Sequence, residues 1–582
     1  MTQDNRFLKR AYVKYLFPIM FSVLGGTINA LIDSVFVSHV AGSAALAAVN
    51  LSMPVYLVQC TAGSLIAGGA YVLSAQAVGR ERTKTAERYY HTALTLSLIF
   101  GALVTVAGLA LCAPIAAALS QGGSLYGYVY DYCLISLLGS IPMILFYLPM
   151  NYLQLEGKMR DVTAVPVILV TVDIALDALF MLPLGMGLRG AALASVISTL
   201  LGCVYAFCAL ERGVSNYHTR LGRLGFFGTA EIVRIGSPMA FNNLFDALRL
   251  LGLNAVILST GGEGYAAIWA VLNTLSELSL IIVSGVPRAG APMLGVYYSA
   301  RENNGIRILL RLECVTGLLL SAGYALALII LQTPIRLMFH LEGAVFFPLA
   351  CLGTAVISYV FCGIWDVFFQ SCGKVGLSNL LLAARKLALP LALALLLRGR
   401  GELLWSFLPL SGVLTLALGG AVTGVLAARS KKTDRPLSRF LLLDDVLERE
   451  NKVLDFSIPP DMVAVCDASE QIQGFCGANH MGPRQSMQLG LSIEELLNVL
   501  IQKIPEMRSV DLRSYALDDM LGLRIRYVGQ SYNPFHDEDS DEDFLMGINL
   551  LRKLSDVTTH TYSLGMNTLN ILFDVSKEHA ET

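Results

Sequence analysis

The sequence predicts an all-α polytopic membrane protein that ends in a soluble α/β domain. Hydrophobic residues make up 55% of the 582 residues and charged residues 15%, and the mean hydropathy is +0.60, which is far from the average of soluble domains. Apolar segments recur along residues 1–428. The tail from Pro436 to Thr582 differs, because it holds 12 Lys and Arg against 24 Asp and Glu.

Twelve segments are apolar over the roughly 20 residues that a transmembrane helix needs. They begin near Leu16, Leu51, Thr92, Val129, Thr163, Gly190, Gly236, Tyr265, Ile308, Phe346, Asn379 and Leu403. An offset of 220 positions aligns identical residues of the two halves without a gap. The aligned pairs are Pro18 with Pro238, Phe21 with Phe241, Leu24 with Leu244, Leu31 with Leu251, Gly42 with Gly262 and Ala47 with Ala267. We therefore expect two six-helix lobes, an N-lobe over 1–220 and a C-lobe over 221–432.

Lysines and arginines gather on alternate connections, which predicts a multi-pass protein of the inner (plasma) membrane with both termini in the cytoplasm. The expected cytoplasmic set includes Arg6, Lys9, Lys14, Arg80, Arg82, Lys158, Arg160, Arg212, Arg234, Arg301, Arg307, Arg311, Lys374, Arg385, Lys386, Arg429 and Lys431. The eleven cysteines have no regular spacing, so we expect neither a disulfide framework nor a zinc site.

Five aspartates lie inside predicted spans, at Asp33, Asp173, Asp177, Asp246 and Asp366. An ionisable group at the middle of a span costs roughly 2.5–3.5 kcal/mol, so it faces a partner or a cavity and indicates function by default. The pair at 173 and 177 shares one helical face. Two such carboxylates favour holding a shared proton or a small cation. The alternative is a packing role, as for the aspartate at 246, which has Arg249 one turn away.

Several short motifs resemble the multidrug and toxic compound extrusion (MATE) transporters. They are DSVFV at 33–37 followed by ALAAV at 45–49, QLEG at 154–157, and DIALD at 173–177 followed by GAA at 190–192. The resemblance covers roughly residues 10–428. It implies two lobes in an inverted V that exchange organic cations for H⁺ or Na⁺ without covalent chemistry.

The resemblance also implies roles for single residues. Asp33 and Asp177 match the acids of the family's N-lobe cation site, and Ser195 matches a hydroxyl position near it. Asp173 stands where the family commonly has Asn, which leaves both H⁺ coupling and Na⁺ binding at these three aspartates open. Asp246 and Asp366 resemble the C-lobe acids of one branch of the family and form a second candidate site.

The expected function is therefore secondary antiport that exports small organic, cationic or amphipathic compounds, with H⁺ or Na⁺ as the coupling ion. We expect no enzyme activity, no required cofactor and no nucleic-acid partner, and membrane lipid is an expected partner. No GxxxxGK[ST] motif is present, which argues against ATP-driven transport. Two alternatives stay open: a flippase for lipids or lipid-linked sugars, which an arginine-lined cavity would favour, and a membrane sensor whose tail is the output.

After a linker at 433–453, residues 454–582 alternate strand-like and helix-like pieces, which predicts a cytoplasmic α/β sandwich. We expect helices over 460–477, 485–503 and 543–554, strands over 454–459, 510–517 and 522–529, and a hairpin over 557–575. The acidic run at 536–543 is expected to be a solvated loop, and a site for Mg²⁺ or for a basic partner is the alternative.

This tail resembles the ATP-binding domain of histidine kinases and anti-sigma-factor kinases. The resemblance places Glu494 at a general base, Asn498 at a Mg²⁺ ligand, and Gly529 and Gly547 in the glycine motifs of a nucleotide site. Tyr527 replaces the expected adenine-binding Asp. We expect a regulatory domain, with a cytoplasmic protein partner as one option. A domain that binds ATP and Mg²⁺ is the second reading, and an active kinase is the least favoured.

Overall fold

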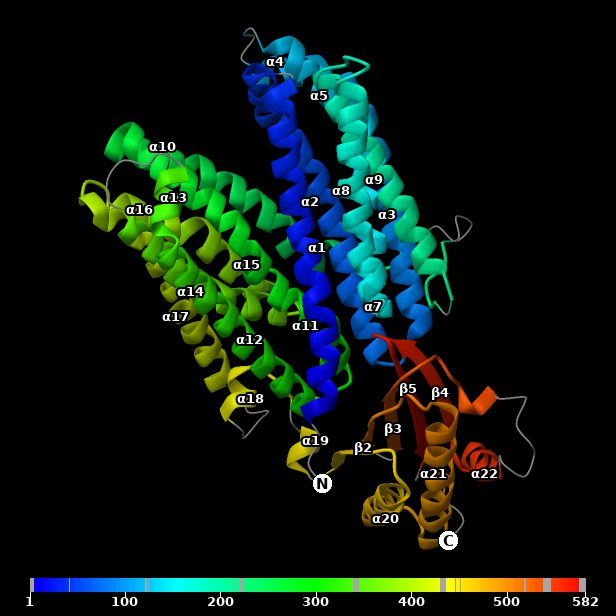
Figure 1. Cartoon of the computed structure of the whole chain (residues 1–582). Coiled ribbons are helices and arrows are strands. Elements are labelled where there is room, and N and C mark those ends of the chain that lie inside the picture. Colours follow the sequence, from blue (N-terminus) through cyan, green and yellow to red (C-terminus); the bar gives the residue numbers. More distant parts are fainter. Residues whose placement is uncertain are drawn as a thin grey trace.

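The computed structural model describes residues 5–40, 42–120, 123, 125–213, 215–219, 225–338, 345–429, 436–444, 446–450, 452–517, 520–536 and 546–574. Within them, eleven helical segments are long and apolar enough to span a membrane. A bent pair, Tyr126–Leu138 with Ser140–Glu156 at 58°, completes twelve. The expected twelve spans and the helical fold class are confirmed (Figure 1). The acidic run lies outside the described residues from Asp537 onward.

The described residues of the N-lobe form nine helices. They are α1 (Asn5–Val40), α2 (Ser43–Gly79), α3 (Thr83–Ala110), α4 (Cys112–Ser120), α5 (Tyr126–Leu138), α6 (Ser140–Leu145), α7 (Tyr147–Glu156), α8 (Met159–Met181) and α9 (Leu188–Glu211). Glycine allows the sharp turn before α8, because Gly157 ends α7 in a left-handed conformation with φ of 77°.

The C-lobe repeats the plan with different breaks. It contains α10 (Thr229–Val283), α11 (Gly285–Ser299), α12 (Asn303–Ile330), α13 (Gln332–Met338), α14 (Phe346–Ser371), α15 (Val375–Ala383), the π-helical turn η2 (Ala384–Ala388), α16 (Leu389–Leu396), η3 (Gly401–Ser406) and α17 (Phe407–Arg429). Helix α10 runs on through Gly262, whereas its counterpart in the N-lobe breaks near Gly42. The repeat therefore preserves the order of the spans but not every turn between them.

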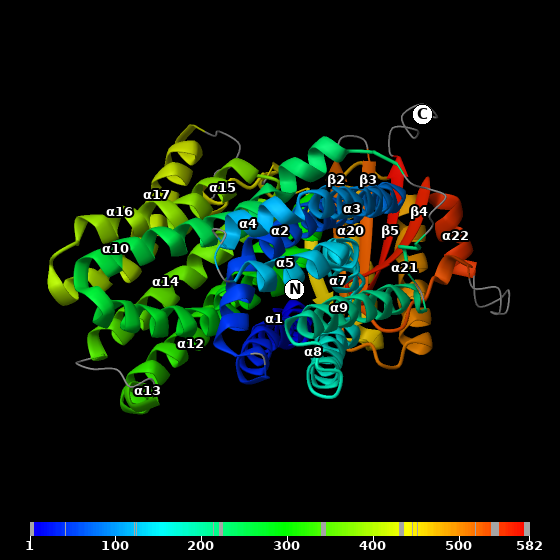
Figure 2. The same cartoon turned by 90° about the horizontal axis from the view of Figure 1, so that it is seen from above.

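The two lobes meet on the side of the tail and diverge away from it (Figure 1), and they lie side by side when seen from above (Figure 2). Glycines allow the close approach. A Cβ on Gly69 of α2 would lie 2.0 Å from the carbonyl oxygen of Ile232 on α10, and one on Gly79 would lie 2.3 Å from that of Val296 on α11. Gln76 Nε2 also donates to the carbonyl of Ser371 at 2.7 Å. The lobes are therefore in direct backbone contact near the tail.

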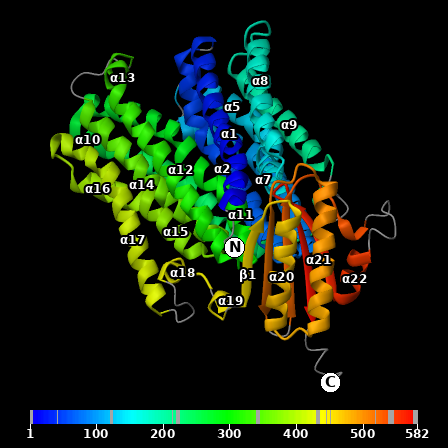
Figure 3. The ribbon, with the colours of Figure 1, turned by 60° about the horizontal axis from the view of Figure 1, so that its bottom comes forward.

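The tail folds as predicted, into one five-stranded antiparallel sheet with helices on one face (Figure 3). Its elements are β1 (Val453–Ile458), α20 (Met462–Ala478), α21 (Pro483–Lys503), β2 (Val510–Leu517), β3 (Met520–Val528), α22 (Met546–Leu554), β4 (Val557–Ser563) and β5 (Met566–Asp574). The strand order is β1-β2-β3-β5-β4. Two short helices, α18 (Pro436–Phe440) and α19 (Val446–Arg449), occupy the expected linker.

The strands alternate between two environments. Apolar side chains such as Phe456, Leu512 and Ile525 form a core with α20 and α21. Their polar neighbours line up across the strands in two rows: Asp455, Arg513, Arg524 and Asn570, and then Ser457, Asp511, Arg526 and Thr568. This polar face turns toward the membrane domain (Figure 3), and most of its residues are buried. We call these eight residues the docked face.

Candidate functional site

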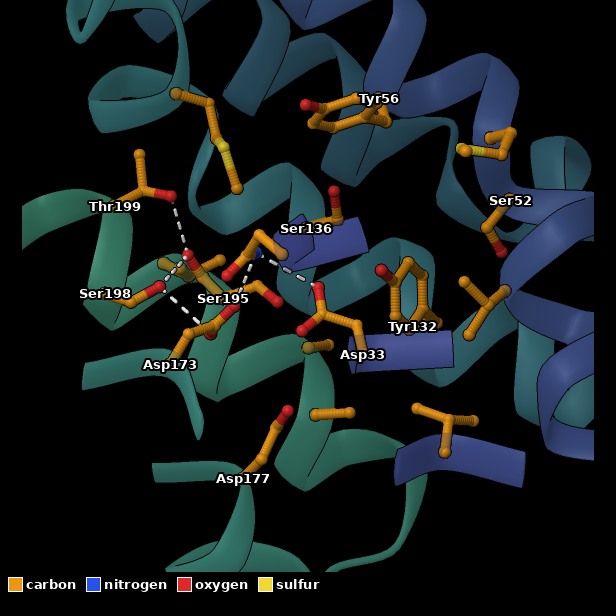
Figure 4. A pocket seen from close by; sticks show the side chains of 18 of the residues that line it. Asp33, Ser52, Tyr56, Tyr132, Ser136, Asp173, Asp177, Ser195, Ser198 and Thr199 are labelled. Atoms are coloured by element: carbon orange, nitrogen blue, oxygen red, sulfur yellow. Dashed lines mark hydrogen bonds between the residues drawn. The ribbon is translucent and has the colours of Figure 1, made fainter. Parts of the chain in front are cut away.

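A cavity of about 390 Å³ lies inside the N-lobe, between α1, α2, α5, α8 and α9 (Figure 4). Three of its lining residues are the predicted acids Asp33, Asp173 and Asp177. Among the described residues that line it, none is Lys, Arg or His. The field inside is therefore negative whenever these acids are ionised, and it attracts cations.

The carboxyl groups of Asp33 on α1 and Asp173 on α8 are bridged by one amide. Asn29 Nδ2 donates to Asp33 Oδ2 at 3.3 Å and to Asp173 Oδ2 at 2.8 Å. Ser198 Oγ on α9 donates to Asp173 Oδ1 at 3.0 Å. Asp173 is fully buried. Both of its oxygens therefore accept hydrogen bonds, which is how a buried carboxylate is held in one position.

Three other oxygens of the cluster have no hydrogen-bond partner although they are buried. They belong to Asn29 (Oδ1), Asp33 (Oδ1) and Asp177 (Oδ1). Asp177 lies one turn along α8 from Asp173 (Figure 4) and is 1% exposed. Buried acceptors that lack a donor among the described residues are suited to take up a proton or to contact a small cation. Oxygen acceptors are also the ligands that hard cations prefer, so these residues fit H⁺ or Na⁺.

Two backbone features bring α1 and α8 together. A Cβ on Gly25 would lie 2.8 Å from the Cβ of Pro166, so only glycine permits this approach. Pro166 lies inside α8, where a proline removes one helical hydrogen bond and bends the helix. These two residues therefore allow α1 and α8, the helices that carry the acids, to pack closely.

The structure adds residues that the sequence analysis missed. Ser195 lines the cavity, as expected, but the hydroxyl that contacts Asp173 belongs to Ser198. Thr199 Oγ1 donates to the carbonyl of Ser195 at 2.8 Å. Asn29 precedes Asp33 by one helical turn, and this spacing was the available signal.

The C-lobe acids lie elsewhere and have basic or hydroxyl partners. Asp246 contacts Lys386, and Arg249 lies 3.5 Å from its other oxygen. Asp366 accepts a hydrogen bond from Ser378. Neither aspartate lines the N-lobe cavity. Such partners are expected if these two acids stabilise helix packing. A role in ion binding stays a prediction.

The assignment of Arg385 and Lys386 to a cytoplasmic connection was wrong. Both lie in η2, inside the span Val375–Leu396. A lysine is tolerated there because its carboxylate partner, Asp246, lies in the neighbouring helix.

The tail residues expected at a nucleotide site are spread along α21. Glu494 accepts from Cys466 Sγ at 3.3 Å, and the Oδ1 of Asn498 is buried without a partner. The amide of Gly547 donates to Glu495, the neighbour of Glu494, at 2.9 Å. A Cβ on Gly529 would contact Ile504, beyond the end of α21. Gly547 is therefore close to the middle of this helix and Gly529 to its far end.

The docked face forms ion pairs with both lobes. Glu302, from the α11–α12 turn of the C-lobe, contacts Arg524 Nη1 at 2.6 Å and also contacts Arg526. Glu81, from the α2–α3 turn of the N-lobe, pairs with Arg524 Nη2 at 2.8 Å. The guanidinium of Arg526 also lies 4.7 Å from the ring centre of Tyr297. One arginine therefore joins the two lobes through two carboxylates.

The β4–β5 turn makes further contacts with the N-lobe. The amide of Leu564 donates to the carbonyl of Leu155 at 2.8 Å, and Asn216 Nδ2 donates to the carbonyl of Tyr562 at 2.8 Å. A Cβ on Gly157 would lie 2.2 Å from the nitrogen of Gly565. We call these contacts, together with the docked-face ion pairs, the tail interface.

Two buried acids of the tail interface have pKa values that are shifted in opposite directions. Burial would raise the pKa of Glu302, but Arg526, Arg524 and Arg513 hold it down to about 2. Burial raises the pKa of Asp511 to about 7 although Arg526 lies close. The first group is therefore ionised at every physiological pH, and the second titrates within that range.

Comparison with known proteins supports the resemblance. The MatE family model matches residues 18–179. The multidrug export protein MepA of Staphylococcus haemolyticus is 21% identical over 301 residues, and that of Staphylococcus aureus (strain bovine RF122 / ET3-1) is 20% identical over 298. These matches cover 50% and 51% of this chain. The chain spans 65% of the length of each of these relatives.

Solved structures share the fold of the membrane domain. A MATE family transporter in an outward-facing conformation is similar with a TM-score of 0.68 and 20% identity, over 73% of this chain and 97% of that one. A transporter from Pyrococcus furiosus, described as having a binding pocket of reverse polarity that suggests a different function, is similar with a TM-score of 0.65 and 20% identity, over 72% and 96%. The residues that match the family model carry all three acids of the cavity.

Proposed function

We propose that this chain is a MATE family transporter that exports small organic cations in exchange for H⁺ or Na⁺. One observation carries the proposal. Three carboxylates from two helices converge on a buried N-lobe cavity that has no basic residue among its described lining. Two of these carboxylates keep an oxygen without a hydrogen-bond donor.

In the proposed cycle, the organic cation and the coupling ion compete for the same carboxylates. With Asp33, Asp173 and Asp177 ionised, the cavity attracts an organic cation. Binding of H⁺ or Na⁺ from the other side of the membrane cancels that attraction and releases the cargo. Exchange then follows from the lobes rocking between two arrangements, as in other two-lobed transporters.

The choice between the two ions rests on Asp173. Its two oxygens are already occupied by Asn29 and Ser198, so it positions the cluster, and the free oxygens belong to its neighbours. Three carboxylates within one cavity repel each other, which favours uptake of protons. This supports H⁺ as the first choice and Na⁺ as the second.

The test is efflux of a fluorescent organic cation from vesicles that hold the full-length protein, under an imposed pH gradient or Na⁺ gradient. Asp33→Asn and Asp177→Asn should each abolish gradient-driven exchange while leaving the purified protein folded. Arg189→Gln is a matched control, because it removes an exposed charge from the N-lobe outside the cavity. Normal exchange by both aspartate variants would contradict the assignment.

A lipid flippase remains the second candidate, and the polarity of the cavity argues against it. Anionic headgroups would need cations where this lining has carboxylates. The vesicle assay separates the two functions, since a flippase moves a labelled lipid between leaflets without requiring an organic cation.

The tail fits a regulatory role through the tail interface. Because it contacts both lobes where they meet, the lobes separate on that side only if the tail releases one of them. A membrane sensor whose tail is the output would instead show no gradient-driven transport, whether or not the tail is docked. Transport by the parent protein and by a variant that cannot dock therefore distinguishes the two.

Nucleotide binding by the tail is the weaker option. Tyr527, which replaces the expected adenine-binding Asp, is fully buried in the core and donates to the carbonyl of Tyr532 at 3.0 Å. Its hydroxyl is therefore already engaged. ATP and Mg²⁺ titrated onto the full-length protein, with Asn498→Ala as the comparison, test this option directly by calorimetry.

A further inference from the structure

A second and larger cavity, of about 980 Å³, lies in the C-lobe. We call it the groove. Its lining residues come from α12, α14, α17 and the region of the short helix α18, with one residue from α1. The ribbon of these helices is shown in Figures 1 and 3, where α18 lies at the end of the C-lobe nearest the tail. The walls of the groove are apolar, with Val315, Trp365, Leu437 and Phe440 among them. It is separate from the cavity with the three acids.

Cations gather at one end of the groove. Lys9 from α1, together with Arg307 and Arg311 from the first turns of α12, completes the lining, and no carboxylate does so among the described residues. Arg307 is committed to Ser438 and Glu448. Lys9 and Arg311 are exposed, and neither has an ion-pair partner in the described part of the chain.

A lining with apolar walls and cations at one end suits an amphipathic ligand with a negatively charged head. The apolar walls suit a hydrocarbon chain, and the two unpaired cations suit a phosphate at the tail side of the membrane. The distribution of Lys and Arg predicts that side to be cytoplasmic, where anionic lipids concentrate. Basic pockets between transmembrane helices on that side are known to bind anionic headgroups.

We propose that the groove binds one anionic phospholipid of the tail-side leaflet, with its phosphate between Lys9 and Arg311 and an acyl chain along α12 beside Trp365. The lipid then contacts both lobes, since α1 belongs to the N-lobe and α12 to the C-lobe. It also contacts α18, whose Phe440 ring lies 5.5 Å from that of Trp365. The site therefore joins the lobes to the segment that leads to the tail, and it does not depend on the cargo of the N-lobe.

Trp365 provides the readout. The full-length protein carrying Trp269→Phe and Trp405→Phe retains this single tryptophan, because the chain has three. It is reconstituted in vesicles with either brominated phosphatidylglycerol or brominated phosphatidylcholine at equal mole fraction. We expect quenching at a mole fraction of the anionic lipid about 25-fold lower, since each cation near a membrane surface contributes about fivefold.

Two further variants decide between specific and general lipid contact. Lys9→Gln with Arg311→Gln should remove the anionic preference, whereas Arg160→Gln with Arg234→Gln, two exposed cations outside the groove, should retain it. Inorganic phosphate in excess should leave the quenching unchanged. Equal quenching by the two lipids, or a preference that survives the loss of Lys9 and Arg311, would overturn the proposal.

If the tryptophan replacements unfold the protein, native mass spectrometry of the wild-type chain gives the same decision. One retained phosphatidylglycerol is expected in the wild type and in the Arg160 and Arg234 control, and none in the Lys9 and Arg311 variant. Retention of phosphatidylcholine with equal frequency would again contradict the proposal.

Discussion

Glu302→Gln should release the tail from the C-lobe. The Glu302 carboxylate is 3% exposed and contacts two arginines of the docked face. The variant keeps the size of the side chain and its capacity for hydrogen bonds, but it leaves Arg524 with Glu81 alone and Arg526 with Asp511, a carboxyl group whose pKa burial raises to about 7. Breaking a buried ion pair by removing one partner costs about 3–5 kcal/mol, because the remaining charge is buried without compensation.

Glutamine still accepts one hydrogen bond, so the lower end of that range applies. A loss of about 3 kcal/mol shifts the docking equilibrium by more than a hundredfold. The assay is hydrogen–deuterium exchange of the peptide that contains Leu564, whose amide donates to Leu155 across the tail interface. We expect faster exchange there and at residues 80–82 and 300–303, with the inner strands of the tail still protected.

Asp131→Asn is the matched control, because it removes the carboxylate of an exposed ion pair with Arg189, and such pairs contribute at most about 1 kcal/mol. Arg526→Gln added to Glu302→Gln should restore part of the protection, since it removes one uncompensated cation. Unchanged exchange at Leu564 in the single variant would refute the reasoning. So would faster exchange throughout the tail, which indicates unfolding and not release.

Three other outcomes are expected. Ser198→Ala should weaken the apparent affinity for the coupling ion about tenfold, since it removes one hydrogen bond to buried Asp173, as measured by exchange rate against ion concentration. Because burial raises the pKa of Asp511 to about 7, its contribution to the folded, docked tail is present at low pH and lost as pH rises through 7. Protection of the tail should therefore be greater at pH 6 than at pH 8, and Asp511→Asn should abolish the difference. Lys386→Gln should lower the thermal stability, since it leaves Asp246 with the more distant Arg249, and Asp246→Asn added to it should restore stability.

The sequence was sufficient for features that depend on segment length, internal repeats and periodicity. The twelve spans follow from the length of the apolar segments, the lobe repeat from identical residues at an offset of 220 positions, and nearly all tail elements from hydrophobic patterns of period 3.6 or 2. Asp33, Asp173 and Asp177 could be named because an acid in a span is costly and therefore informative. Their convergence follows from Gly25 and Pro166, two residues that the sequence shows but whose mutual contact it does not.

Features that depend on contacts between residues far apart in the sequence could not be predicted from periodicity. Arg385 and Lys386 were placed in a loop because positive charge usually marks one, and only the position of Asp246 in space shows why Lys386 lies within a span. The alternating polar residues of β2 and β3 are typical of a solvated sheet face. They are buried here against the membrane domain. Their partners, Glu302 and Glu81, lie in turns more than 200 residues away in the sequence, and periodicity does not reveal such a contact.

The tail interface lies directly before the helix that carries two of the three acids of the cation cavity. The β4–β5 turn touches Leu155 and Gly157, and α8, which carries Asp173 and Asp177, begins two residues later. The distance along α8 from its start to Asp173 is about 21 Å, given a rise of 1.5 Å per residue. If docking and ion binding select the same arrangement of the lobes, each must alter the other by the same factor. The coupling ion should then change exchange at Leu564 in the parent protein and leave it unchanged in Asp177→Asn. A parent protein whose tail ignores the ion would show that docking and ion binding are independent, and the tail would then act on transport by some route other than the position of the lobes.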